Sequence, residues 1–250
     1  MHRTSVLRHL LRTTWLVLLL AVFAAPAPAA PLTLIDSAGD IDAWPAVTLM
    51  PEAGKALGID EVLVQLGRFV PPGAAHANLG VRRDAVWLRV PLEVPVTESG
   101  RWMLDIDYPS LDRIDVYHIA DGLPVQHVTL GDSLTFGKRP HAARSHAVAL
   151  VLEPAIEHEL LLRVETTSSM IVPIRFLQAE AFQAREARVQ MLQGLMTGIG
   201  LCLLLYSLAQ WLNQRETMFL HYAITTAGTT LFFFSFYGLG PSTCGPTTPG

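Results

Sequence analysis

The chain has little charge for its length and almost no cysteine. Only 16% of its 250 residues are charged, whereas a soluble globular domain carries about a quarter. Half of the residues are hydrophobic, which excludes an intrinsically disordered chain. The two cysteines, Cys202 and Cys244, are too few for a disulfide-stabilised scaffold. A net charge of −4 without runs of Lys or Arg argues against any nucleic-acid partner.

One concentration of apolar residues lies at the N-terminus. Three arginines precede an uncharged apolar run at residues 15–25, and alanines and prolines follow as far as Ala29. This run is too short to cross about 30 Å of hydrocarbon as a helix, and the pattern is typical of an export signal. We therefore predict a signal peptide at residues 1–29. An uncleaved signal anchor is the alternative, and the prolines argue against it.

The other concentration lies at the C-terminal end. Residues 189–214 contain no Asp, Glu, Lys or Arg, and such charges recur only at Arg215 and Glu216. About 20 apolar residues suffice to span a bilayer as a helix. We predict two transmembrane helices, at residues 191–212 and 218–238, that form a hairpin in the lipid bilayer.

Glycines in the first predicted span could bring helices close together. Gly194 and Gly198 have the spacing of a small-residue stripe, which favours close packing and offers a route to a homodimer. Chance occurrence of glycine in a membrane helix is an equal alternative. Residues 179–190 contain no Gly or Pro, so we predict a juxtamembrane helix that runs without a break into the span.

Between these ends, residues 30–178 have the pattern of a β domain. From residue 86 onward, hydrophobic and polar residues alternate in seven short segments separated by turn signals, without strand–helix alternation. We predict an all-β jelly roll or sandwich, whereas residues 31–83, with several prolines and glycines, are expected to be irregular. The alternation places one set of side chains inside: Val86, Leu88, Val90, Leu104, Ile106, Val116, Leu150, Leu162 and Val164.

Several short motifs precede the predicted hairpin in a fixed order. They are Trp87-Leu88-Arg89; Trp102-x-Leu104-x-Ile106-x-x-Pro109-x-Leu111-Asp112; Gly131-Asp132 with Phe136 and Arg139-Pro140; and Leu162-Arg163-Val164 with Ser168-Ser169. Over about residues 42–176 this order resembles the type 2 extracellular domain of the seven-transmembrane receptors with diverse intracellular signalling modules.

The resemblance implies a jelly-roll sensor domain, similar to a carbohydrate-binding module, in front of seven membrane helices and a kinase, cyclase or phosphatase. Here the tail at residues 239–250 does not read as a third helix. We expect a truncated gene or a partial sequence, so that any output enzyme would lie beyond this chain. The chain itself is then not an enzyme and needs no cofactor.

A search for catalytic residues supports that expectation. The sequence has no nucleophile elbow, no phosphate-binding loop and no Cys-x-x-Cys. Acidic residues that could hydrolyse glycosides or hold calcium gather at Asp105, Asp107, Asp112 and Asp115. Because Asp105 and Asp107 alternate with core positions, we expect them on a solvent-exposed face.

Two histidines flank the turn at residues 121–122. His118 and His127 could face each other in a hairpin and titrate near neutral pH or bind a metal. A third ligand is not evident, so we favour ordinary surface histidines and predict no metal site.

The loop at residues 131–140 is the most distinctive one. It carries an acid, two bases and an aromatic residue. Asp132 could pair with Lys138 or Arg139 to close the loop, or the loop could bind a ligand, as loops at the end of a sandwich do. We predict a binding site for a small molecule, by resemblance a carbohydrate, at Trp87, Arg89, Asp132 and Arg139.

The sequence thus favours the ligand-sensing part of an inner-membrane signalling receptor. The signal peptide places the β domain in the periplasm, although Arg185 and Arg188 outside the first span outnumber Arg215 inside it. We give the signal peptide more weight, because long domains are translocated largely regardless of charge. Two alternatives are a membrane-tethered periplasmic glycan hydrolase and a periplasmic protein-binding adaptor.

Overall fold

The computed structural model describes most of the chain. The described residues are 30–52, 54–73, 76–133 and 145–236. The predicted signal peptide at residues 1–29, the tail at 239–250 and Arg139 lie outside them.

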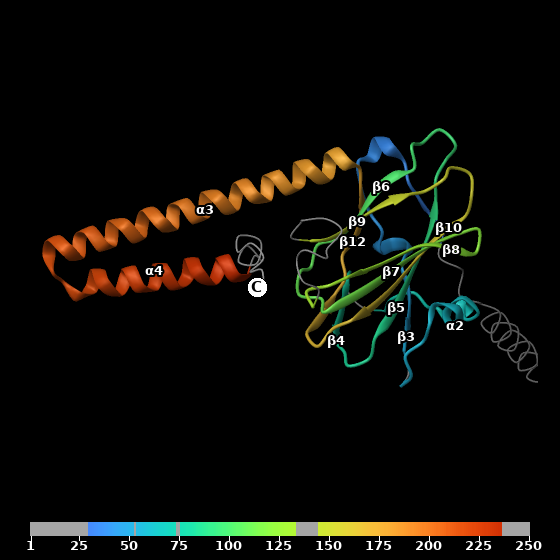
Figure 1. Ribbon diagram of the computed structural model, residues 1–250, viewed down its shortest axis with the longest axis horizontal. Helices are drawn as coiled ribbons and strands as arrows, with labels where there is room; N and C mark the ends of the chain where they lie inside the picture. Colours follow the sequence, from blue (N-terminus) through green and yellow to red (C-terminus); the bar gives the residue numbers. More distant parts are fainter. Residues whose placement is uncertain (1–29, 53, 74–75, 134–144, 237–250) are drawn as a thin grey trace, which may run out of the picture. The chain divides into compact units, whose positions relative to one another are not determined.

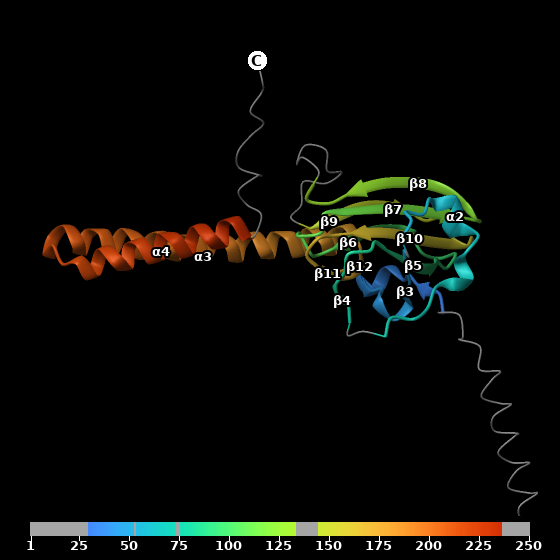
Figure 2. The same cartoon turned by 90° about the horizontal axis from the view of Figure 1, so that it is seen from below.

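Two sheets form a β-sandwich, as predicted (Figures 1 and 2). The larger sheet has the order β1 (Leu32–Thr33), β5 (Val86–Glu93), β10 (His158–Glu165), β7 (Arg113–Ala120) and β8 (Leu123–Leu130), with β3 (Thr48–Pro51) also paired to β5. The smaller sheet has the order β2 (Asp40–Asp42), β12 (Ile174–Leu177), β6 (Arg101–Ile106) and β9 (His146–Val151). A separate two-stranded ribbon pairs β11 (Ser169–Ile171) with β4 (Asn78–Val81).

The main core lies between the two sheets. Leu88 and Leu162 of the larger sheet belong to the same buried cluster as Leu104 and Phe176 of the smaller sheet. All nine residues predicted to point inward are at most 2% exposed. Period-two alternation is sufficient to identify them, because successive side chains of a strand point to opposite faces.

A second, smaller core covers the outer face of the larger sheet. Residues 52–70, which include the short helix α2 (Ile59–Leu63), lie over this face. Their cluster with the sheet consists of Met50, Val62, Phe69, Trp87, Ile119 and Leu161. The prediction that residues 31–83 are irregular is therefore wrong. Their strands are only two to four residues long, too short to show a period.

Two long helices follow the sandwich and lie side by side (Figures 1 and 2). α3 (Ala179–Gln214) is continuous, as predicted, and its 36 residues are about 54 Å long. α4 (Thr217–Phe236) follows a reversal at Arg215, whose left-handed backbone (φ 58°) ends α3. Within the described residues, α3 alone has the length and composition needed to cross a membrane.

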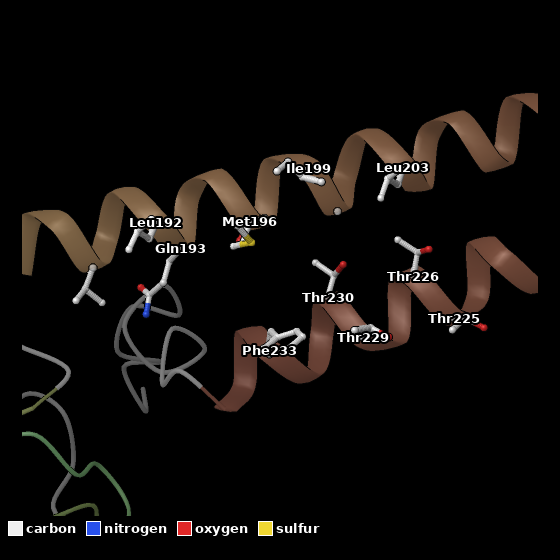
Figure 3. A pocket seen from close by; sticks show the side chains of 13 residues that line it. Leu192, Gln193, Met196, Ile199, Leu203, Thr225, Thr226, Thr229, Thr230 and Phe233 are labelled. Atoms are coloured by element: carbon white, nitrogen blue, oxygen red, sulfur yellow. The ribbon is translucent and has the colours of Figure 1, made fainter.

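A hollow of about 590 Å³ lies between the two helices, and Thr226 and Thr230 of α4 point toward α3 beside it (Figure 3). A Cβ atom on Gly200 would lie 2.6 Å from Oγ1 of Thr230, so glycine permits the close approach of the helices there. A Cβ atom on Gly194 or Gly198 would meet no described atom within 4 Å other than the neighbouring backbone of α3 itself. The homodimer through these two glycines remains a prediction.

Candidate functional site

A groove of about 630 Å³ lies where β5 and β10 meet, at the end of the larger sheet. Its polar lining consists of Arg89, Glu93, Glu157, His158 and Glu159. Its apolar lining includes Pro91, Leu92, Val94, Pro95, Val96 and Ile156. The groove therefore combines hydrogen-bonding groups with an apolar wall, as small-molecule sites do.

Arg89 and Glu159 form an ion pair across neighbouring strands of this groove. Both side chains are partly buried, and the pair is a charge-assisted hydrogen bond from Nη2 to Oε1. Arg89 Nε is buried and has no hydrogen-bond partner in the described residues. The pair thus presents donors and acceptors next to each other, which suits a ligand with hydroxyl groups.

His158 connects the groove to the core. Its Nδ1 lies 3.0 Å from Nε2 of His118, and its Nε2 lies 2.9 Å from the carbonyl oxygen of Glu153. Because that carbonyl can only accept, Nε2 of His158 donates to it, and Nδ1 of a neutral His158 accepts from His118. Burial, and then the charge of His158, lowers the pKa of His118 to about 4. His118 is therefore uncharged at neutral pH.

Of the two histidines that we interpreted as surface residues, His127 is exposed and His118 is buried, and the two do not face each other. In the β7–β8 hairpin, His118 lies opposite Gln126, and His127 lies opposite Tyr117. A shift of one residue in register moves a side chain to the other face of a sheet. His118 consequently points into the sandwich, whereas His127 is exposed and stacks on Tyr117 with ring centroids 4.2 Å apart.

Trp87 lies on the same face of β5 as Arg89, as predicted, but it is fully buried. Residues 52–70 cover it, and its Nε1 donates to Oε1 of Glu52 over 2.7 Å. The prediction that Trp87 forms part of the ligand site conflicts with this burial, because no face of the indole ring is exposed. The alternation of side chains along β5 identified the face on which Trp87 lies, but it could not identify the segment that covers that face.

Glu52 fastens this covering segment to the sheet. Arg163 of β10 donates to both of its carboxylate oxygens over 2.8 and 2.9 Å, and the amide of Leu57 donates over 3.2 Å. Burial alone would raise the pKa of Glu52, but the hydrogen bonds from Arg163 and Trp87 hold it below its usual range. The carboxylate remains ionised and holds the cover in place.

The loop predicted to bind ligand begins at the opposite end of the larger sheet. Gly131 follows Leu130, which pairs with Ile114, whereas the groove lies near the Ala120–His158 pair. Gly131 has φ 139°, and a Cβ atom there would lie 2.2 Å from the carbonyl oxygen of Asp112. Glycine is thus required for the loop to start.

The structure therefore does not gather the four predicted site residues. Arg89 lines the groove, Trp87 is buried under residues 52–70, and Asp132 is exposed at the far end of the sheet. Arg139 lies outside the described residues. A role of Asp132 and Arg139 in ligand binding remains a prediction. Sequence reasoning missed Glu157, His158 and Glu159, because only strand register brings them beside Arg89.

The four aspartates considered for catalysis all have structural partners. Asp115 accepts from Arg113 and Thr129, and burial, which raises its pKa, is outweighed by these bonds, so that the pKa lies below its usual range. Asp112 accepts from the backbone and hydroxyl of Thr167. The described residues contain no group of three side chains that could hold a metal.

The expected solvent-exposed face at Asp105 is also wrong. Asp105 is 2% exposed, because α3 covers it and Arg185 of that helix donates to it over 2.7 Å. The same arginine donates to Asp107 over 2.6 Å. The alternation of side chains along β6 again predicted the correct face of the strand. The helix that covers this face comes from 80 residues further along the chain, so the alternation could not reveal it.

Solved structures that match the chain share little sequence identity with it. A putative beta-galactosidase from Bacteroides fragilis is 11% identical with a TM-score of 0.33, over 52% of this chain and 21% of that chain. A cycloisomaltooligosaccharide glucanotransferase from Paenibacillus sp. is 13% identical with a TM-score of 0.28, over 55% and 18%. The chain thus spans about a fifth of the length of these enzymes. No curated protein matches it.

Two family matches cover the chain in order. The domain described as 7TMR-DISM extracellular 2 matches residues 45–178, which include all strands of the two sheets except β1 and β2. The region described as 7TM diverse intracellular signalling matches residues 189–249, which include most of α3 and all of α4. The chain belongs to the seven-transmembrane receptors with diverse intracellular signalling modules, and it carries their type 2 extracellular domain and part of their membrane region.

Proposed function

We propose that the chain is the ligand-sensing input portion of a signalling receptor in the inner membrane, with its sandwich in the periplasm. Its ligand is a small polyhydroxylated molecule, such as a carbohydrate, bound in the groove between β5 and β10. The two matched domains are input domains, so no catalytic step is assigned to the chain.

The groove and its Arg89–Glu159 pair carry this proposal. A sugar hydroxyl both donates and accepts hydrogen bonds, so it can bridge a guanidinium and a carboxylate. The apolar wall at Val96 and Ile156 suits the C–H face of a sugar ring. No observation favours the hydrolase or the adaptor.

The proposal is tested by ligand-induced stabilisation of the full chain in detergent. A panel of mono- and oligosaccharides is titrated while thermal unfolding is followed. At a concentration about 100 times its Kd, a bound sugar should stabilise the fold by about 2.7 kcal/mol. Arg89→Gln should weaken binding by about tenfold, because a charged hydrogen bond is lost.

Arg101 supplies the matched control, since it is exposed and lies outside the groove. Arg101→Gln should bind the same sugar as the wild type does. If no sugar stabilises the chain, or if Arg89→Gln binds as tightly as the wild type, the groove is not a carbohydrate site.

A further inference from the structure

The junction between the sandwich and α3 is a single residue long. β12 ends at Leu177 and α3 begins at Ala179, so that only Gln178 lies between sheet and helix. The amide of Gln178 donates to the carbonyl oxygen of Gly39 over 2.8 Å, and its side chain donates to Asp36 over 2.8 Å. The helix therefore starts from a fixed point on the smaller sheet.

A second attachment follows in the second turn of α3. One guanidinium, that of Arg185, bridges Asp105 in β6 and Asp107, which follows directly after this strand. Asp105 is 2% exposed, Asp107 is 23% exposed and Arg185 is 31% exposed. Two attachments about two turns apart define both the direction of the helix and its rotation about its own axis.

Two neighbouring charged residues of the smaller sheet, Arg175 and Asp42, pair with residues of the sandwich itself. Arg175 lies opposite Asp105 in the β12–β6 register, and its Nε donates to Asp40 over 2.8 Å. Asp42 lies 2.7 Å from His76. Arg185 differs from these cations because it belongs to the helix that enters the membrane.

The length of α3 makes this contact mechanically relevant. Its 36 residues exceed the roughly 20 that span a bilayer, so the helix continues as a stiff element from Arg185 to the hydrocarbon. A hydrophobic helix responds to a change in bilayer thickness by tilting. A tilt at the membrane must then either move β6 or break the contacts of Arg185.

We propose that Arg185, Asp105 and Asp107 form a latch that couples the smaller sheet of the sandwich to the membrane helix α3. Through this latch a change in β6 alters the orientation of α3, and a change in the tilt of α3 alters β6. Such coupling is reciprocal by thermodynamic necessity, so it can be measured from the membrane side without a ligand. The latch does not depend on the carbohydrate proposal.

The test uses the full chain in nanodiscs of short-chain or long-chain phosphatidylcholine and measures amide hydrogen exchange. In the wild type, exchange of β6 and β12 should differ by about fivefold between the two lipids, since mismatch costs fractions of a kcal/mol per Å. In Arg185→Gln this lipid dependence should fall below about twofold. Exchange in β5 serves as the internal reference for an intact fold.

Arg188→Gln is the matched control, because Arg188 is exposed one turn further along the same helix. It should retain the full lipid dependence. The proposal is overturned if β6 of the wild type does not respond to the lipid, or if Arg185→Gln responds as the wild type does. If Arg185→Gln also lowers the hydrogen-exchange protection of β5, the variant is misfolded, and Arg185→Lys is used to test the latch instead. Lysine keeps the charge but cannot bridge both carboxylates, so an undiminished lipid dependence in that variant overturns the latch.

Discussion

On the outer face of each sheet, a buried carboxylate pairs with an arginine, and this pair joins the sheet to the segment that covers it. The two covering segments differ. On the larger sheet the acid, Glu52, comes from the covering segment and Arg163 comes from the sheet. On the smaller sheet the acid, Asp105, comes from the sheet and Arg185 comes from the covering helix.

Residues 52–70, which cover the larger sheet, are attached to it by both polar and apolar contacts. Glu52 accepts from Arg163, Trp87 and Leu57, and the apolar cluster around Val62 and Phe69 completes a second core beside it. Water has little access to these charges. Removing one partner would leave the other charge buried, and the segment therefore behaves as part of the domain.

The cover of the smaller sheet is a helix that belongs to the membrane region. Arg185 keeps about a third of its side chain exposed, so water can solvate the guanidinium when its bonds break, whereas Asp105 would remain buried. The two covers thus differ in the exposure of the arginine, which is 15% for Arg163 and 31% for Arg185. Both covers are attached by an arginine–carboxylate pair, and the two pairs differ in how deeply the arginine is buried.

The largest effect is expected from Glu52→Ala. It leaves the indole nitrogen of Trp87 without its acceptor and leaves Arg163 with the half-exposed Glu165 alone, which should cost about 3–5 kcal/mol of unfolding free energy. Chemical denaturation of the full chain in detergent, followed by tryptophan fluorescence, measures the loss. The exposed Asp84→Ala is the control. A loss below about 1 kcal/mol would show that apolar contacts alone hold the cover.

The next effect is a dependence on pH that His118 confers on the larger sheet. Its pKa in the folded state is about 4, below the usual value of 6.5, so the unfolded chain takes up the proton first. Stability is therefore full above about pH 6.5 and falls as the pH drops toward 4, by up to about 3 kcal/mol. Denaturation midpoints at several pH values in this range measure the slope.

His118→Gln keeps a donor to His158 but does not titrate, so it should flatten this slope. His127→Gln, a histidine change at an exposed position of the neighbouring strand, is the comparison variant. Glu52 and Asp115 add to this slope only near its acidic end, because folding lowers their pKa values and the unfolded carboxylates take up protons first, near their usual pKa of about 4. An equally steep slope in His118→Gln would assign the pH dependence to another group.

Local patterns in the sequence predicted the strands, the main core and the long helix. Leu88, Leu104 and Leu162 alternate with polar residues, and this period identifies a buried strand face without any knowledge of the partner strand. The continuous helix followed from the absence of Gly and Pro at residues 179–190 and from the uncharged apolar run at residues 189–214. These features depend on neighbours within one element.

Features that depend on distant segments were not predictable. Trp87 and Asp105 occupy polar-side positions of their strands, yet residues 52–70 bury the first and α3 buries the second. The facing of His118 depends on hairpin register, and the groove depends on the pairing of β5 with β10. Neither register nor long-range covering leaves a periodic signal in the chain.

The smallest effect on stability, and the sharpest test of the comparison, is expected from Asp107→Asn. Asp107 is 23% exposed, and its loss of charge leaves Arg185 with Asp105, so the unfolding free energy should fall by less than about 1 kcal/mol. The first two turns of α3 should nevertheless exchange their amide hydrogens faster, because one of the two bonds that fix the rotation of the helix is gone. Asp84→Asn, an equal change of charge away from the helix, should leave both quantities unchanged. If Asp107→Asn instead destabilises the chain as strongly as Glu52→Ala does, both covers are integral parts of the domain, and the difference in arginine burial has no mechanical consequence.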